Sequence, residues 1–83
     1  MVPSKLTLLV RAYCHLCDQM RQALLPLAEA NGIAVEEIDV DSDSGLEARW
    51  GDKVPVLLAG DVELCHYRFD GAAVASHLAC GAR

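Results

Sequence analysis

The sequence predicts an α/β fold with the element order β-α-β-α-β-β-α and a four-stranded mixed sheet. Short, apolar, β-rich runs alternate with stretches whose apolar residues recur every three or four positions, as they do on one face of a helix. A helical stretch separates the first two strands, which should therefore be parallel with a right-handed crossover. The tight turn Gly60-Asp61 joins the last two strands, which must be antiparallel.

The first strand and the first helix are the clearest elements. Lys5–Arg11 is almost continuously apolar, as is typical of a strand buried on both faces. Leu16–Asn31 should form a helix, because its leucines and a methionine make one apolar stripe and Asn31 precedes a glycine. Pro26 lies inside this stretch, lacks an N–H group and would clash with the carbonyl of Gln22. We therefore expect a kink there, or a break into two pieces.

The second strand is expected over Ile33–Val40. Its apolar alternation changes phase at Glu36-Glu37, which indicates a bulge or an edge strand. Ser44 is followed three positions later by Glu47, the pattern of a capping box, and this predicts a short helix over Gly45–Trp50.

The third strand, Val54–Ala59, has a proline at its start, and the fourth strand should cover Val62–Arg68. Asp70 is expected to cap a last helix over Gly71–Cys80. The chain shows no repeat, linker or low-complexity segment, so residues 1–83 should form a single domain with one modest core.

Composition narrows the classes of function. The net charge of −5 argues against a nucleic-acid partner, because phosphate binding needs a basic face. The longest apolar run is too short to span a membrane, and Met1–Lys5 leads into a strand without a secretion signal. We therefore expect a cytoplasmic monomer that binds neither nucleic acid nor membrane. In the reducing cytosol a C-x-x-C pair is more often catalytic than structural.

Cys14 and Cys17 form such a pair between the first strand and the first helix. The free N–H groups and the positive dipole end at a helix N-terminus stabilise a thiolate, which is the nucleophile in disulfide exchange. Cys14 would attack a disulfide, and Cys17, one turn further on, would resolve the mixed disulfide. A C-x-x-C beside a strand–helix unit is typical of thiol redox proteins.

Two other interpretations stay open. The domain could hold an iron–sulfur cluster or a metal through Cys14, in a site shared across a dimer. However, a zinc site would need a second C-x-x-C or a Cys/His set, and Cys65 and Cys80 are fifteen positions apart, so we expect no metal ligands. The domain could also be a non-catalytic interaction module. We expect Cys65 to be a buried small hydrophobe and Cys80 to be incidental.

Other side chains around the motif allow two interpretations each. His15 could stabilise the Cys14 thiolate as an imidazolium, or it could be an exposed linker residue. Tyr13 could cover the thiol or form a wall of the cleft. We expect Trp50 and Tyr67 to be packing residues rather than a stacking platform.

The order of elements resembles the thioredoxin fold in its minimal glutaredoxin form, with Cys14-His15-Leu16-Cys17 at the first helix and Val54-Pro55 at the third strand. The segments Leu6–Asp18, Ile38–Asp41 and Leu46–Leu57 are similar to a family of small bacterial glutaredoxin-like proteins. The likeness covers nearly the whole chain. It implies helices on both faces of the mixed sheet and a dithiol–disulfide oxidoreductase activity.

The resemblance also implies roles for residues outside the dithiol. Pro55 would be a cis-proline facing the cysteines, and Val54 would offer its backbone N–H and C=O groups to the bound thiol partner. Arg11 stands where glutaredoxins often carry a lysine that helps hold glutathione. Asp70-Gly71 corresponds to the helix cap that holds the glutamyl end of glutathione. The partner would then be a disulfide-bearing protein or glutathione as co-substrate, with no bound cofactor required.

Overall fold

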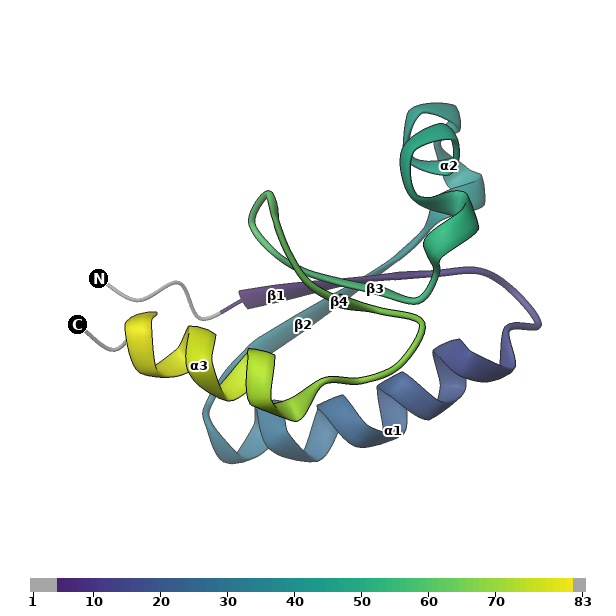
Figure 1. Cartoon of the computed structure of the whole chain (residues 1–83). Coiled ribbons are helices and arrows are strands. Elements are labelled where there is room, and N and C mark those ends of the chain that lie inside the picture. Colours follow the sequence, from purple (N-terminus) through teal and green to yellow (C-terminus); the bar gives the residue numbers. More distant parts are fainter. Residues whose placement is uncertain (1–4, 82–83) are drawn as a thin grey trace.

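The computed structural model describes residues 5–81, with side chains as far as Leu78, so Met1–Ser4 and the side chain of Cys80 lie outside the described part. Four strands form one sheet in the order β2-β1-β3-β4, with α1 and α3 against one face and α2 on the other side (Figure 1). The elements are β1 Lys5–Val10, α1 His15–Ala30, β2 Ala34–Asp39, α2 Ser44–Trp50, β3 Val56–Ala59, β4 Val62–His66 and α3 Gly71–Gly81, with 3₁₀ turns η1 Val40–Ser42 and η2 Gly51–Lys53 around α2. The predicted order and fold class are confirmed.

The strand pairing follows the prediction and determines which loops meet. β1 is parallel to β2 and antiparallel to β3, and β3 is antiparallel to β4. Leu9 pairs with Val56, and Val56 pairs in turn with His66. The C-terminal end of β1, the start of β3 and the end of β4 therefore lie side by side at one edge of the sheet.

Apolar side chains form a core on each face of the sheet. Between the sheet and the helices α1 and α3 lies a cluster made of Leu6, Leu8, Met20, Leu24, Leu57, Cys65 and Val74. On the α2 side lies a second cluster made of Leu9, Val40, Trp50, Val56 and Leu58. The central strands β1 and β3 supply both clusters, which explains their continuous apolar runs.

The phase change in β2 has a different cause from a bulge. β2 is an edge strand, which confirms one of the two expected alternatives. It has no bulge against β1, because the register of the two strands runs without a shift from Lys5↔Ala34 to Val10↔Asp39. Val35 packs against the α1 side, whereas Ile38 packs against the α2 side. The apolar phase changes because the strand serves one core in its first half and the other core in its second half. A register shift does occur at Leu57/Leu58, between β3 and β4.

Of the two outcomes expected at Pro26, a kink or a break, the break does not occur, because α1 runs as one helix through this residue. Pro26 and Gln22 are both exposed, so solvent can bond to the carbonyl that loses its partner. The predicted capping box at Ser44 is also wrong. Asp43 caps α2 instead, its Oδ1 accepting from the N–H groups of Gly45 at 2.8 Å and Leu46 at 3.2 Å.

The two strands of the β3–β4 hairpin are shorter than predicted. Val54 and Pro55 precede β3, and β4 ends at His66 because Tyr67 adopts a left-handed conformation with φ 64°.

No helix among residues 5–81 is both long and apolar enough to cross a membrane.

Candidate functional site

Three segments meet at the edge of the sheet where β1 ends. They are the loop from β1 into α1, which carries the two cysteines, the segment Val54-Pro55 before β3, and Tyr67 after β4. The N–H of Tyr67 donates to the carbonyl of Pro55 at 2.9 Å. The strand pairing thus brings the predicted site residues of the first and second halves of the chain to one edge of the sheet, together with Tyr67.

Cys14 is the N-cap of α1. Its backbone is extended, with φ −100° and ψ 111°, and its Sγ accepts a hydrogen bond from the N–H of Cys17 at 3.1 Å. A side chain that accepts at this position satisfies one of the free donors of the first helical turn. The thiol of Cys14 is partly exposed. The sulfur is therefore both accessible and directed at the positive end of the helix.

Cys17 has a contrasting environment. Its side chain is 1% exposed and lies in the first turn of α1. Burial, followed by the hydrogen bond to Cys14, raises the pKa of Cys17 to about 11. The backbone of Arg11 and the charge of Arg21 act in the opposite direction but are outweighed. The Cys17 thiol therefore stays protonated, behind the accessible thiol of Cys14.

His15 is exposed, and its Nε2 lies 3.1 Å from the Nε2 of Gln19, one turn along the helix. The structure thus places the imidazole on the outer face of α1. The side chain of Tyr13 is fully exposed, so it does not cover Cys14.

Tyr13 and Tyr67 share an unusual backbone. Among residues 5–81 they are the two non-glycine residues with positive φ, at 59° and 64°. Such conformations carry strain and gather at ligand-binding and catalytic sites. Here one lies directly before Cys14, and the other is bonded to Pro55.

The peptide bond between Val54 and Pro55 is cis, as the resemblance implied. Pro55 is fully buried, and Val54 is partly buried with φ −61° and ψ 145°. The hydroxyl of Tyr67 donates to the carbonyl of Asp52 at 2.7 Å. Tyr67 was expected to be a packing residue, but its side chain is 46% exposed and instead ties this turn to the end of β4. Trp50, by contrast, is buried as expected.

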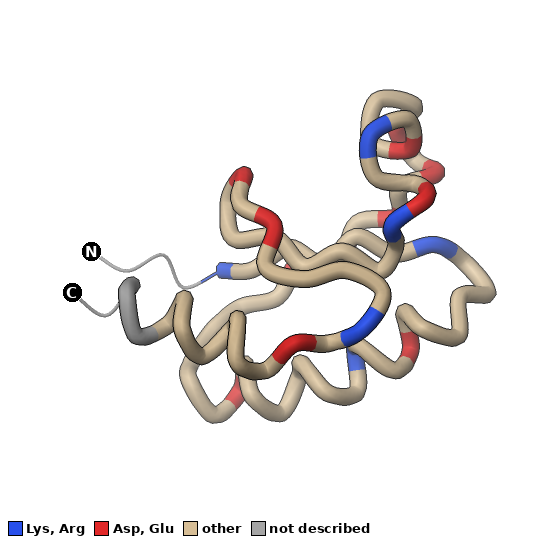
Figure 2. Tube along the Cα trace, viewed as in Figure 1, with Lys and Arg blue, Asp and Glu red and all other residues tan. Residues whose placement is uncertain are grey.

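Arg11 is engaged in an ion-pair network. Its guanidinium donates to both carboxylate oxygens of Asp41 at 3.1 Å, to Glu47 at 3.1 Å and to the carbonyl of Gly51 at 3.3 Å. Figure 2 shows basic and acidic positions gathered around α2. The hydrogen bonds to Asp41 and Glu47 raise the pKa of Arg11. The network ties the end of β1 to α2, a task that the sequence did not reveal.

Asp70 caps α3, as predicted. Its Oδ1 accepts from the N–H of Ala73 at 3.0 Å, and its carbonyl accepts from Val74 at 3.2 Å, which places Gly71 in the first turn. Cys65 is 8% exposed, which confirms a buried cysteine, and burial raises the pKa of its thiol. The backbone N–H of Asp70 opposes that shift.

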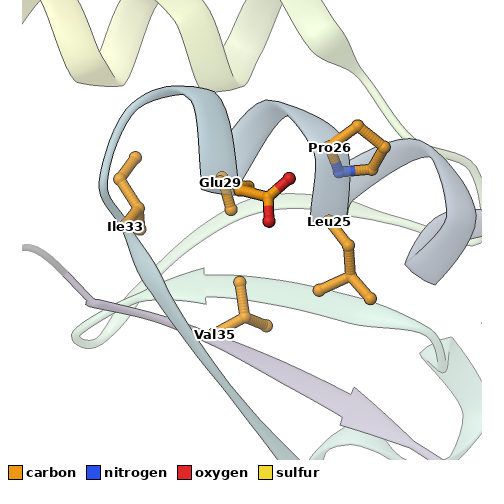
Figure 3. Close-up of a pocket in the computed structure, with 6 residues that line it drawn as sticks. Leu25, Pro26, Glu29, Ile33 and Val35 are labelled. Atoms are coloured by element: carbon orange, nitrogen blue, oxygen red, sulfur yellow. The ribbon is translucent and has the colours of Figure 1, made fainter.

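Two pockets lie along α1. One, of about 560 Å³, opens beside the C-terminal half of the helix and is lined by Leu25, Pro26, Ala28, Glu29, Ile33 and Val35 (Figure 3). Leu25 is eight residues beyond Cys17, or about 12 Å along the axis, so this pocket is remote from the dithiol. The other, of about 280 Å³, lies closer and is lined by Gln19, Met20, Tyr67, Arg68 and Phe69. Sequence reasoning missed the last three as site residues.

Among the side chains described, no three His, Cys, Asp or Glu residues gather as a metal site would require.

The sequence matches the Glutaredoxin-like domain (DUF836) family over residues 5–79. The chain belongs to this family.

The chain is also similar to other proteins and to solved structures over most of its length. Uncharacterized protein Rv0508 of Mycobacterium tuberculosis is 34% identical over 68 residues, which cover 76% of this chain and 70% of the relative. The solution structure of protein Ne2328 from Nitrosomonas europaea has 35% identity, a TM-score of 0.82 and 93% coverage of both chains. Protein XcR50 from X. campestris has 38% identity, a TM-score of 0.67 and coverage of 90% and 96%. Thioredoxin 1 of Thermosipho africanus, at 21% identity, a TM-score of 0.63 and coverage of 92% and 91%, shares the fold.

Proposed function

We propose that this glutaredoxin-like protein is a thiol–disulfide oxidoreductase in which Cys14 is the nucleophile and Cys17 the resolving thiol. The observation that carries this proposal is the asymmetry of the pair. The Sγ of Cys14 is accessible and accepts the N–H of Cys17 at 3.1 Å, while the Cys17 thiol is buried one turn inside the helix. A thiolate at Cys14 would keep this hydrogen bond and would also face the helix dipole.

The exchange is a sequence of two displacements. The Cys14 thiolate attacks one sulfur of the substrate disulfide, and the other sulfur leaves as a thiolate, which takes a proton from solvent. The Cys17 thiol then loses its proton to solvent and attacks the Sγ of Cys14, and the bound substrate sulfur leaves as a thiolate and takes a proton from solvent. The substrate gains two electrons and two protons, and Cys14 and Cys17 form a disulfide. The raised pKa of Cys17 keeps this thiol inactive until the mixed disulfide has formed.

The segment before β3 supports substrate binding. The register of β1 with β3 includes Leu9↔Val56, and Val54 lies two residues before this pair, outside β3. Its extended backbone can pair with the backbone of a disulfide-bearing peptide, as in β-augmentation. Pro55 has no N–H group that would need a partner.

The same chemistry indicates which substrates and which recycling thiol the protein uses. The substrates are disulfide-bearing proteins or mixed disulfides of glutathione, and a low-molecular-weight thiol such as glutathione returns the Cys14–Cys17 disulfide to two thiols. No bound cofactor is needed for these steps, because the electrons reside in the sulfur atoms. We propose that the protein acts as a monomer in the cytoplasm.

Reduction of insulin and of a glutathione mixed disulfide by three variants tests the proposal. Cys14→Ser should abolish both reactions, and Cys17→Ser should stop after the first exchange and accumulate a mixed disulfide at Cys14. Cys65→Ala is the matched control, since it removes another buried thiol, and should keep the activity. Equal residual activity in the Cys14 and Cys17 variants would reject the proposal. A brown, dimeric protein whose colour is lost in Cys14→Ser would favour the iron–sulfur alternative.

A further inference from the structure

The pocket between α1 and residues 67–69 is lined by residues that contact the dithiol site. One wall includes Gln19, whose amide contacts His15 between the two cysteines. The other includes Tyr67, whose N–H donates to the carbonyl of Pro55. Gln19 is about one turn, or ~5.4 Å, from His15 along the helix. A substrate residue one or two positions from the reacting cysteine, at about 3.3 Å per residue, can reach this distance.

Arg68 gives this pocket its charge. Four of the six Lys and Arg residues whose side chains the structure describes have carboxylate partners within 4 Å; these are Lys5, Arg11, Arg21 and Lys53. The guanidinium of Arg49 lies 4.9 Å from the ring centroid of Trp50. Arg68 has no carboxylate partner among the described side chains, although the chain carries a net charge of −5. The lining of the pocket thus includes an exposed arginine without a carboxylate partner among the described side chains, together with Gln19, Tyr67 and Phe69.

The backbone that presents Arg68 is held in a strained turn. The N–H of Arg68 donates to the carbonyl of His66 at 2.7 Å, across Tyr67 with its φ of 64°. An i→i+2 bond around a residue with positive φ is characteristic of the less common, strained form of the γ-turn. Two bonds from Tyr67, to the carbonyls of Pro55 and Asp52, keep the turn in place. Strain of this kind is typical of ligand clamps.

We propose that this pocket binds a carboxylate adjacent to the substrate disulfide, and that Arg68 is the specificity-determining residue that recognises it. The inference rests on the oxidoreductase function proposed above. Gln19 provides a second hydrogen-bonding group, and the rings of Tyr67 and Phe69 pack against the aliphatic part of the ligand. The carboxylate has two sources, an acidic side chain of a protein substrate or the carboxylates of glutathione.

The test uses mixed disulfides between a chromophoric aromatic thiol and short cysteine peptides that carry either Glu or Gln two positions from the cysteine. The rate constant for release of the chromophore should be about two- to five-fold higher for the Glu peptide, the range of a partly exposed ion pair. Arg68→Gln should abolish this preference, and Arg68→Glu should reverse it in favour of a Lys peptide. Arg49→Gln changes the net charge by the same amount outside the pocket, and should keep the preference for Glu.

Glutathione and its diester, coupled to the same chromophore, identify the source of the carboxylate. If Arg68→Gln slows the reaction of the unesterified glutathione disulfide alone, then glutathione is the ligand. If it slows the reaction of the Glu peptide disulfide alone, then acidic proteins are the ligand. Equal rates for the Glu and Gln peptides together with equal rates for glutathione and its diester in the natural protein, or equal effects of the two arginine variants, would overturn the inference.

A second measurement does not depend on catalysis. Peptides with Ser in place of the reacting Cys are titrated while the backbone amide shifts of Gln19 and Arg68 are followed by NMR. Tighter binding of the Glu peptide, lost in Arg68→Gln, supports the pocket even if the protein reduces no disulfide, in which case the oxidoreductase proposal alone fails. No difference between the peptides rejects an acidic protein as the ligand, and equal rates for glutathione and its diester then reject the pocket.

Discussion

The backbone N–H of Cys17 donates to the Sγ of Cys14 over 3.1 Å, while the thiol of Cys17 itself is only 1% exposed. Two cysteines of one short motif therefore have opposite environments. Cys14 is outside the helix, as its cap, and Cys17 is inside the first turn, against the core. The proposed order of attack and resolution follows from where α1 begins, and chemistry at each sulfur can test it.

Cys14 should be the first thiol to react with an alkylating agent. Limiting iodoacetamide near neutral pH should label Cys14 before Cys17 or Cys65, because those two side chains are 1% and 8% exposed. Mass mapping of the labelled site measures this order. The work is best done in a Cys80→Ser background, so that the signal comes from these three thiols. Labelling of Cys65 at the same rate as Cys14 would contradict the difference in accessibility.

The reduced protein should lose stability as the pH rises from about 9 to about 11. The pKa of Cys17 is raised from the ordinary 9.0 to about 11 in the folded protein. Below pH 9 the Cys17 thiol is protonated in both the folded and the unfolded state, so the folded protein keeps its full stability. Above pH 9 the unfolded chain releases the proton first, so stability falls until the folded thiol also ionises near pH 11. Two pKa units correspond to about 2–3 kcal/mol.

Denaturant unfolding at several pH values, in the presence of a reductant, measures this loss. Cys17→Ala is the matched control, because it keeps Cys65 and every other group that titrates in this range. The variant should lose less stability between pH 9 and 11 than the natural protein. Parallel pH profiles for the two proteins would mean that burial of Cys17 does not govern this dependence.

Arg11→Gln should lower the melting temperature, because the variant loses the bonds that tie β1 to Asp41 and Glu47. The loss should be smaller at high salt, since exposed ion pairs are screened. Lys5→Gln is a suitable control, because it breaks the single exposed pair with Glu36 and should change stability little. An unchanged melting temperature combined with a raised KM for glutathione mixed disulfides would instead support the substrate role that the family resemblance implied for Arg11.

The case of Arg11 shows where sequence reasoning stops. Its acidic partners lie 30 and 36 positions away, and no local pattern connects them. The same holds for Tyr67, whose bonds to Pro55 and Asp52 exist because β3 and β4 pair. Contacts that depend on the packing of distant segments leave no periodic signal in the chain.

The elements themselves could be predicted because apolar periodicity reports which face of an element is buried. Met20 and Leu24 form the predicted stripe of α1, and both lie in the core beneath the sheet. For β2 the predicted edge position is confirmed and the alternative of a bulge is not, because the apolar phase changes where Val35 and Ile38 serve different cores. The cysteine pair was found because its chemistry is local, contained within one strand–helix junction.

Two variants distinguish the role of Asp70 as a helix cap from a role in substrate binding. Asp70→Ala removes the oxygen that accepts the N–H of Ala73, and should cost about 1 kcal/mol of the free energy of unfolding. Asp70→Asn keeps a capping oxygen and should be nearly as stable as the natural protein, because asparagine is also a strong N-cap residue. Both variants lose the negative charge. If Asp70 binds the amino group of a glutathionyl substrate, both should raise KM equally, whatever their stability. If Asp70 acts as a cap alone, denaturant unfolding should distinguish the two variants, while their KM values should match that of the natural protein.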